Sequence, residues 1–181
     1  MNDFKIIFSG PVCAGKTTAI STLSDEAPVC TNQIASDETR EKKPETTIAM
    51  DYGTLSLGRH EKIHLYGTPG QERFDFMWDI LTENGLGLVL LLDNTGKDPL
   101  NDMVFFLESF KDYIDKTAVA IGITRTDIVP LLSLDPYQEK LKELGFKAAV
   151  FEVDARNYSD MSYLVQALLF TIDPGLECSA A

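Results

Sequence analysis

The chain is poor in basic residues and has no long apolar run. It carries 16 lysines and arginines against 28 aspartates and glutamates, so its formal net charge is -12 over 181 residues. Binding to nucleic acid requires a local basic patch that overcomes such a field, and the sequence has none. The longest apolar stretch, residues 86–92, is far too short to cross a bilayer. These features argue against a nucleic-acid partner and against a transmembrane helix.

Cysteine is also scarce, at three residues. An odd number at irregular spacings fits neither a disulfide framework nor a metal site, and it suits a reducing compartment. The first residues lack the basic region and the apolar stretch of a signal peptide. Residues 178–181 have the form of a prenylation box, but the segment before them is acidic rather than polybasic. We therefore expect a cytoplasmic protein without a membrane anchor.

Strand-length apolar runs alternate with helix-period segments along the whole chain. This alternation predicts an α/β fold with a mostly parallel sheet that helices cover on both faces. The expected strands are residues 4–9, 48–57, 62–67, 87–93, 117–123 and 148–153, and the expected helices are 16–24, 72–83, 100–114, 135–144 and 159–171. The turn-like segment 57–61 predicts a hairpin whose first strand is antiparallel at the sheet edge. We therefore predict a six-stranded sheet in one domain over residues 1–181.

Residues 10–17 read Gly-Pro-Val-Cys-Ala-Gly-Lys-Thr, a complete G-x-x-x-x-G-K-[ST] motif that follows the apolar run 4–8. A strand that leads through a tight loop into a helix aims several backbone amides and the positive helix end at one phosphate. Lys16 is expected to reach the β- and γ-phosphates, and the Thr17 hydroxyl to bind Mg²⁺. A glycine-rich turn without a ligand is the alternative, which this strand and helix context disfavours. The motif predicts a P-loop NTPase that binds phosphates through Gly10, Val12, Cys13, Ala14, Gly15, Lys16, Thr17 and Thr18.

Residues 25–46 form a polar, charged segment without any hydrophobic period. Loops of this length inside compact domains are usually functional or mobile. A switch that responds to the bound nucleotide suits the segment. A solvated connection without a function of its own is the alternative.

A second motif follows the predicted strand 62–67 and reads Tyr66-Gly67-Thr68-Pro69-Gly70-Gln71-Glu72-Arg73-Phe74. Here the chain resembles the Ras-like small GTPases, whose third motif is Asp-x-x-Gly followed by Gln-Glu. With residues 47–53, 66–74 and 76–78 it is similar to a bacterial branch related to the polarity and gliding-motility GTPases. The resemblance covers nearly all of the chain. It implies one small-GTPase domain over residues 1–181 that binds GTP or GDP with Mg²⁺.

The resemblance also implies roles near the γ-phosphate. In such proteins the glycine of the third motif donates its amide to the γ-phosphate and the next glutamine orients the attacking water, which points to Gly70 and Gln71. A threonine before the second strand closes over Mg²⁺ and the γ-phosphate, and Thr47 fits that position best. Loss of the γ-phosphate releases these contacts and changes the surface. The implied catalytic residues are Lys16, Thr47 and Gln71, and the implied metal ligands are Thr17 and Thr47.

Two later segments resemble the motifs that select guanine. Residues 124–127 are similar to [NT]-K-x-D, in which the carboxylate of the aspartate accepts hydrogen bonds from guanine N1 and N2. Adenine lacks that pair of donors, so Asp127 disfavours ATP. For Asp127, a role as a turn former is the alternative. Residues 154–156 fall where a Ser-Ala-Lys motif is expected, and the Ala155 amide would donate to the base carbonyl. The implied base-binding residues are Thr124, Arg125, Asp127, Asp154, Ala155 and Arg156.

The chain departs from the family pattern at two positions. Gly67 stands where the third-motif aspartate normally holds Mg²⁺ through a water, so another acid, Asp51 or Asp93, is a candidate substitute. Asp93 has a second interpretation, in which it hydrogen-bonds loop amides and shapes the phosphate loop. Val12 stands where Ras has a glycine, and its branched side chain could obstruct an arginine from a partner, leaving Arg40 as a source within the chain. An arginine finger contributes about 10³- to 10⁵-fold in rate, so unassisted hydrolysis is expected to be slow.

We therefore expect a GTP-dependent molecular switch, a slow GTPase that signals through regulatory and effector proteins. The resemblance implies bacterial signalling and regulators of the roadblock or longin type. A module that binds GTP with negligible hydrolysis is one alternative, which Gly67 and Val12 encourage. A P-loop nucleotide or metabolite kinase is another, with residues 90–93 as its metal-binding strand end. Such kinases close an arginine-rich lid, whereas the five arginines of this chain are scattered.

Overall fold

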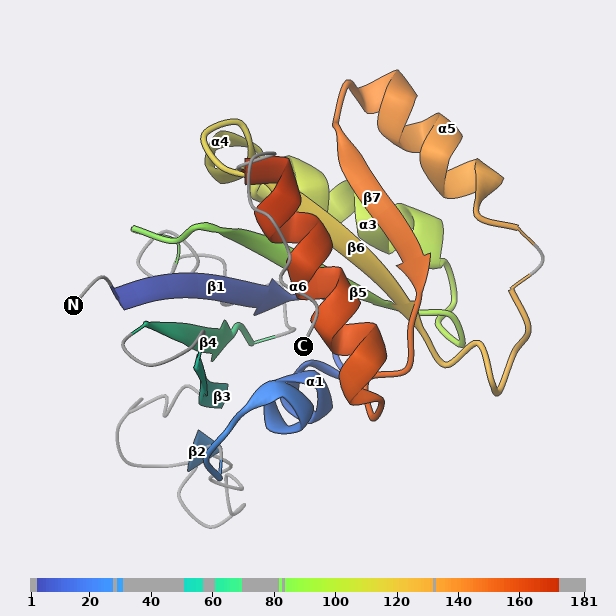
Figure 1. The fold of residues 1–181 in the computed structure, drawn as a ribbon. Helices are drawn as coiled ribbons and strands as arrows, with labels where there is room; N and C mark the ends of the chain where they lie inside the picture. Colours follow the sequence, from blue (N-terminus) through green and yellow to red (C-terminus); the bar gives the residue numbers. More distant parts are fainter. Residues whose placement is uncertain are drawn as a thin grey trace, which may run out of the picture.

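A seven-stranded sheet is the frame of the protein (Figure 1). The computed structural model describes residues 3–27, 29–30, 51–56, 61–69, 82, 84–131 and 133–172. The strands are β1 Asp3–Ser9, β2 Val29–Cys30, β3 Asp51–Ser56, β4 Lys62–Gly67, β5 Gly87–Asp93, β6 Val119–Thr124 and β7 Ala148–Glu152. Across the sheet they follow the order β2-β3-β4-β1-β5-β6-β7.

Parallel pairing dominates the sheet. β1 pairs in parallel with β4 and β5, and β5, β6 and β7 continue in parallel. β3 is antiparallel to both β2 and β4. In the β3–β4 hairpin, Asp51 lies opposite Gly67 at one end and Ser56 opposite Lys62 at the other. This register brings the first residue of β3 beside the last residue of β4, at the edge of the sheet where β1 also ends.

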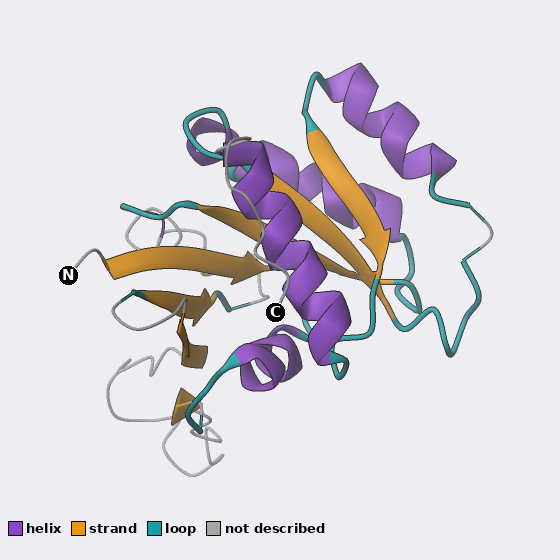
Figure 2. Ribbon diagram, in the orientation of Figure 1, coloured by secondary structure: helices purple, strands orange, loops and turns teal. Residues whose placement is uncertain are grey.

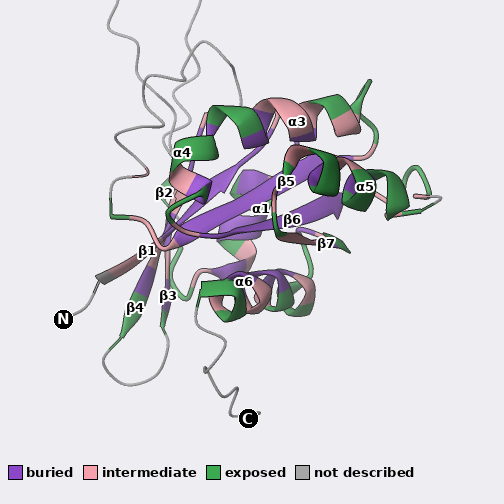
Figure 3. Cartoon of the chain, turned by 90° about the horizontal axis from the view of Figure 1, so that it is seen from above, coloured by how far each residue is buried: buried purple, intermediate pink, exposed green. Residues whose placement is uncertain are grey.

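Helices cover both faces of the sheet, as Figure 3 shows. They are α1 Lys16–Leu23, α3 Pro99–Ser109, α4 Lys111–Ile114, α5 Asp135–Leu144 and α6 Tyr158–Ile172. The apolar residues of α1 and α6 share one hydrophobic cluster with one face of the strands, and those of α3, α4 and α5 share a second cluster with the other. Every residue of β5 and β6 is buried, as expected for central parallel strands covered on both sides. Among the described helices none is long and apolar enough to span a membrane.

The predicted α/β fold class is confirmed, with one addition. The two-residue strand β2 pairs outside β3, so the antiparallel strand lies next to the sheet edge rather than at it. A strand this short leaves no periodic signal in a sequence. The predicted helix 100–114 is interrupted at Phe110 and forms α3 and α4. Nearly all of the predicted helix 72–83 and the first residues of the predicted strand 48–57 lie outside the described residues.

The connections after β1 and β5 place the candidate site. The chain leaves β1 for α1 on one face and leaves β5 for α3 on the opposite face (Figure 2). Open α/β sheets bind ligands beyond the carboxyl ends of strands at such a change of side. The phosphate motif follows β1, and the base motifs follow β6 and β7, so all three lie at this edge of the sheet.

Candidate functional site

The loop between β1 and α1 is a tight curl of backbone. Gly10 has a φ of 138°, and a Cβ atom there would overlap the carbonyl oxygen of Leu91 on the neighbouring strand β5. Cys13 and Gly15 both have left-handed backbone, with φ of 67° and 95°. Non-glycine residues adopt that conformation at a cost of about 1–3 kcal/mol, and such residues cluster at ligand sites. Alternation of right- and left-handed residues turns successive amides towards one point, which forms an anion-binding concavity.

The first turn of α1 leaves its amides available to a ligand. The first helical hydrogen bond of α1 runs from the amide of Ala19 to the Gly15 oxygen, at 2.8 Å. The amides that precede it at a helix N-terminus have no partner within the helix. They carry the positive end of the helix dipole as well. The loop therefore offers the donors and the field that a phosphate group needs.

Lys16 lies inside this curl and is only 7% exposed. Its ammonium group donates to the carbonyl oxygens of Gly10 at 2.8 Å and Pro11 at 2.7 Å. Burial lowers the pKa of Lys16 to about 8, although the nearby Asp51 and Cys13 act in the opposite direction. A charge that is desolvated, and whose hydrogen bonds among the described residues go to neutral carbonyls, would gain strongly from an anion. The side chain is thus prepared for a phosphate.

Proton uptake on nucleotide binding is expected from this lowered pKa. A bound diphosphate raises the pKa of Lys16 far above 8, so the neutral fraction of the free protein must take up a proton when it binds. Calorimetric titration with GDP, in buffers of different ionisation enthalpy, should give an uptake that grows as the pH rises through the region around 8. Affinity should fall with rising pH above 8. An uptake that does not grow over this pH region would contradict the role of Lys16.

Thr17 and Asp51 meet beside the loop. The Thr17 hydroxyl donates to Oδ2 of Asp51 at 2.5 Å. Asp51 is the cross-strand partner of Gly67, and a Cβ atom on Gly67 would lie 3.0 Å from the Cβ atom of Asp51. The other candidate acid is engaged elsewhere: Asp93 lies 3.1 Å from the Arg125 guanidinium and accepts hydrogen bonds from Thr95. Of the two acids, Asp51 is the one beside the predicted metal ligand Thr17.

The predicted base loop is attached to the phosphate loop. The buried hydroxyl of Thr124 lies 3.0 Å from the carbonyl oxygens of both Ala14 and Leu92. From the other side, the hydroxyl of Thr22 on α1 donates to the Ala155 oxygen at 2.8 Å. These bonds connect the segments after β1, β6 and β7 in one network. The phosphate and base motifs therefore hold a fixed relative position.

Replacement of Thr124 by valine tests this connection. The substitution keeps the shape and removes the hydroxyl, so the buried carbonyl of Ala14 loses its donor. We expect a loss of about 1–3 kcal/mol in the free energy of unfolding and weaker GDP binding. Denaturant unfolding and a fluorescence titration measure the two effects. Thr171→Val is the matched control, because the Thr171 hydroxyl bonds a carbonyl on the exposed side of α6; an equal loss there would refute a special role for Thr124.

The predicted guanine acceptor is paired with an arginine. Arg156 lies 2.8 Å from Oδ2 of Asp127 and 2.7 Å from Oδ2 of Asp154. The hydrogen bonds from the Arg156 side chain hold the pKa of Asp154 below its usual range. All three side chains are exposed, and exposed ion pairs contribute little to stability, so a ligand can readily rearrange them. Arg125 adopts left-handed backbone, with a φ of 61°, at the start of the same loop.

The structure brings together one set of the predicted site residues and does not describe the rest. Thr47, Gly70 and Gln71, and the candidate arginine Arg40, lie outside the described residues. The residues that gather at the carboxyl edge of the sheet are Gly10, Val12, Cys13, Ala14, Gly15, Lys16, Thr17, Thr18, Thr124, Arg125, Asp127, Asp154, Ala155 and Arg156. The link from Thr124 to the phosphate loop was not predicted, because a hydroxyl 110 residues away in the chain leaves no local signal.

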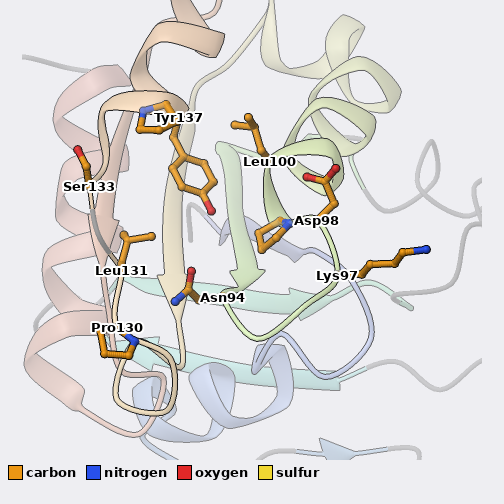
Figure 4. Close-up of a pocket in the computed structure, with 10 residues that line it drawn as sticks. Asn94, Lys97, Asp98, Leu100, Pro130, Leu131, Ser133 and Tyr137 are labelled. Carbon is orange, nitrogen blue, oxygen red and sulfur yellow. The ribbon is translucent and has the colours of Figure 1, made fainter.

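A second hollow lies beside the base loop (Figure 4). The connections after β5 and β6 line it with residues that include Asn94, Asp98, Leu131 and Tyr137. The side-chain amide of Asn94 donates to the carbonyl of Val129 and joins the two connections. None of the predicted site residues lines this hollow. Its lining residues therefore do not overlap with the described residues of the predicted nucleotide site.

Comparison with known proteins supports a small GTPase-like fold. No family model matches the chain. The G domain of the T. maritima FeoB iron transporter superposes with a TM-score of 0.63 at 18% identity, over 93% of this chain and 98% of that domain. The Ras-related protein RGP2 of Oryza sativa subsp. japonica is 22% identical over 152 residues, which are 82% of this chain and 64% of RGP2, so the chain spans less than two thirds of that relative.

A nearer relative is the uncharacterized protein MJ1339 of Methanocaldococcus jannaschii. It is 32% identical to the chain over 128 residues, which cover 70% of this chain and 73% of MJ1339. None of these relatives is described as a polarity or motility GTPase, so membership of that branch stays a prediction. The alignment extends over most of both proteins, and the chain belongs to the family of MJ1339.

Proposed function

We propose that the protein is a GTP-binding switch that hydrolyses GTP slowly to GDP. The observation that supports this most is the hydrogen bond from Thr124 to Ala14, because it joins the guanine motif to the phosphate motif. Those two motifs are recognised separately in the sequence, and their meeting at one edge of the sheet is what a nucleotide that spans both requires. The buried Lys16, which donates to the carbonyls of Gly10 and Pro11, supplies the charge for its phosphates.

Mg²⁺ fits the oxygen donors beside the loop. Thr17 offers a hydroxyl and Asp51 a carboxylate, and Mg²⁺ favours one or two such oxygens together with substrate phosphates and waters. The ion would neutralise charge on the β- and γ-phosphates. Lys16 binds the same phosphates, and the amides of the loop orient them. Gln71 would orient the attacking water, and Thr47 and Gly70 would respond to the γ-phosphate as the family resemblance implies.

The arginines that the structure describes near the site support slow hydrolysis. Arg125 pairs with Asp93, and Arg156 pairs with Asp127 and Asp154, so in this structure carboxylates hold both guanidinium groups. Val12 is exposed at the loop, where a partner's arginine would approach. We propose that a protein partner accelerates hydrolysis and that effector proteins bind the GTP form. Regulators of the roadblock or longin type, bacterial signalling and the polarity branch belong to this proposal through the resemblance alone.

The nucleotide that co-purifies with the protein tests the proposal directly. Extraction and chromatography of the bound nucleotide should yield GDP or GTP. Calorimetry with Mg²⁺ should then show binding of both guanine nucleotides and none of ATP. Preferential binding of ATP would support the kinase alternative and overturn the switch. Single-turnover cleavage of GTP, with and without added cell extract, separates the switch from a module without hydrolysis, since the module cleaves in neither case.

A further inference from the structure

We propose that Asp51 is the carboxylate that holds Mg²⁺ at the phosphate loop, in place of the acid that is missing at Gly67. The assignment rests on the proposed nucleotide site. In the family pattern the acid that orients the metal stands at the end of β4, whereas here it would stand at the start of β3. As a consequence, the Asp51 side chain would connect the metal ion to strand β3, which follows residues 31–50 in the chain.

The first support is the space beside Gly67. Asp51 and Gly67 are directly opposite in the antiparallel pair β3–β4. A Cβ atom on Gly67 would lie 3.0 Å from the Cβ atom of Asp51 and 3.3 Å from its Oδ2. Contacts of 3.0 Å between carbon atoms are well inside van der Waals distance. A side chain at position 67 would therefore crowd Asp51, and also the Cδ1 atom of Ile20 at 3.0 Å, so an acid there would require its neighbours to shift.

The second support is the contact with Thr17. Oδ2 of Asp51 accepts a hydrogen bond from the Thr17 hydroxyl, which the phosphate motif assigns to the metal. Thr17 is exposed and Asp51 is half-buried, so the two oxygens face a region open to solvent and to a nucleotide. Among the described residues no group of three acidic, histidine or cysteine side chains could hold a metal. A hydroxyl with one carboxylate suits Mg²⁺, which keeps several waters and takes its other ligands from phosphates.

The third support is that the alternative acid is occupied. Oδ1 of Asp93 accepts hydrogen bonds from the amide and hydroxyl of Thr95, and its Oδ2 pairs with Arg125. Both oxygens of Asp93 thus have protein partners, and they shape the loop after β5. Asp51 accepts a hydrogen bond from the Thr17 hydroxyl, a group that would turn towards a metal ion when one binds.

The test measures how Mg²⁺ slows the release of a fluorescent GDP analogue. In the wild-type protein, release should be much slower with Mg²⁺ than with EDTA. Asp51→Asn keeps the size of the side chain and removes its charge, and we expect it to reduce metal affinity roughly 10- to 100-fold, so that release with Mg²⁺ approaches release with EDTA. The matched control is Asp112→Asn on α4, an exposed acid far from the loop, which should keep the wild-type ratio.

An exchange of the two residues gives a stricter test. The double variant Asp51→Gly with Gly67→Asp returns the acid to β4 and removes its contact with the Asp51 side chain. The remaining close contact is Ile20 Cδ1, the end of a flexible side chain at 3.0 Å, so the effect of Mg²⁺ on release should recover. Gly67→Asp alone should not improve metal binding, because its side chain meets Asp51. Thermal unfolding checks that each variant is folded. If the exchange variant does not fold, the comparison of Asp51→Asn with Asp112→Asn decides.

The outcomes separate this assignment from the proposed function. A wild-type protein that binds no GDP overturns the function and the assignment together. A wild-type protein that binds GDP with a clear Mg²⁺ effect, beside an Asp51→Asn variant with the same effect, overturns the assignment alone. Loss of the effect in Asp51→Asn but not in Asp112→Asn supports it, and recovery in the exchange variant supports it further.

Discussion

Replacing Lys16 by methionine is expected to lower the affinity for GDP about 100-fold. The ammonium group is buried in the phosphate loop, where it now bonds the carbonyls of Gly10 and Pro11. A hydrogen bond between charged partners contributes up to about 3 kcal/mol, and 1.4 kcal/mol corresponds to about tenfold in affinity. Methionine has a similar length and no charge, so it removes this term while it fills the same space. A titration with fluorescent GDP measures the loss.

The thermal stability of the Lys16→Met variant tests whether the loss of GDP affinity comes from the binding site rather than from unfolding. Burial lowers the pKa of Lys16, which means that the folded protein holds this charge at an energetic disadvantage at pH 7. Methionine removes that disadvantage but also leaves the carbonyls of Gly10 and Pro11 without this donor. The two effects oppose each other, so we expect a Tm within about 4 °C of the wild type. Lys140→Met is the control, because Lys140 is half-buried on α5, away from the phosphate loop, and pairs with Glu143. Unchanged GDP affinity in a folded Lys16→Met variant would refute the phosphate-loop assignment.

Replacing Asp127 by asparagine is expected to change the preferred base from guanine to xanthine. In the proposed site the carboxylate would accept two hydrogen bonds from guanine, whereas an asparagine amide would present a donor to guanine N2 and leave it unmatched. Sites that hydrogen-bond a ligand reject one without the matching groups by about 10⁴-fold or more, so we expect a loss of at least about 10²-fold for GTP. The affinity for xanthosine triphosphate should rise, because its C2 oxygen can accept a hydrogen bond from the asparagine amide. Competition titrations with the two nucleotides measure the change.

The pairing of Asp127 with Arg156 adds a second readout. In the wild type, a guanine base must share or displace the Arg156 guanidinium, which retains Asp154 as a partner. Exposed pairs of this kind weaken with salt. The shift in base preference should therefore persist at high salt if Asp127 contacts the base itself. Equal GTP affinity in the Asp127→Asn variant and the wild type would mean that the base is selected elsewhere. Asp112→Asn on α4 controls for the loss of one negative charge.

Part of the fold could be predicted because its signals are local. The apolar runs of β5 and β6 are continuous and fully buried, which is typical of central parallel strands. The interruption between α3 and α4 could not be predicted, because buried residues on both sides of Phe110 keep a helical spacing. β2 escaped prediction as well, since two residues pair with β3 only where the tertiary structure brings them together.

The sequence by itself determined the phosphate loop, since a strand, a glycine-rich turn and a helix with lysine and threonine are consecutive in the chain. It also placed the base motifs after buried strands. The tertiary structure decided which distant groups meet: Thr124 with Ala14, Arg156 with Asp127, and Asp51 with Thr17 across the space beside Gly67. The physical reason is that backbone conformation depends on neighbouring residues, whereas contacts between side chains depend on strand order and register, which only the folded sheet fixes.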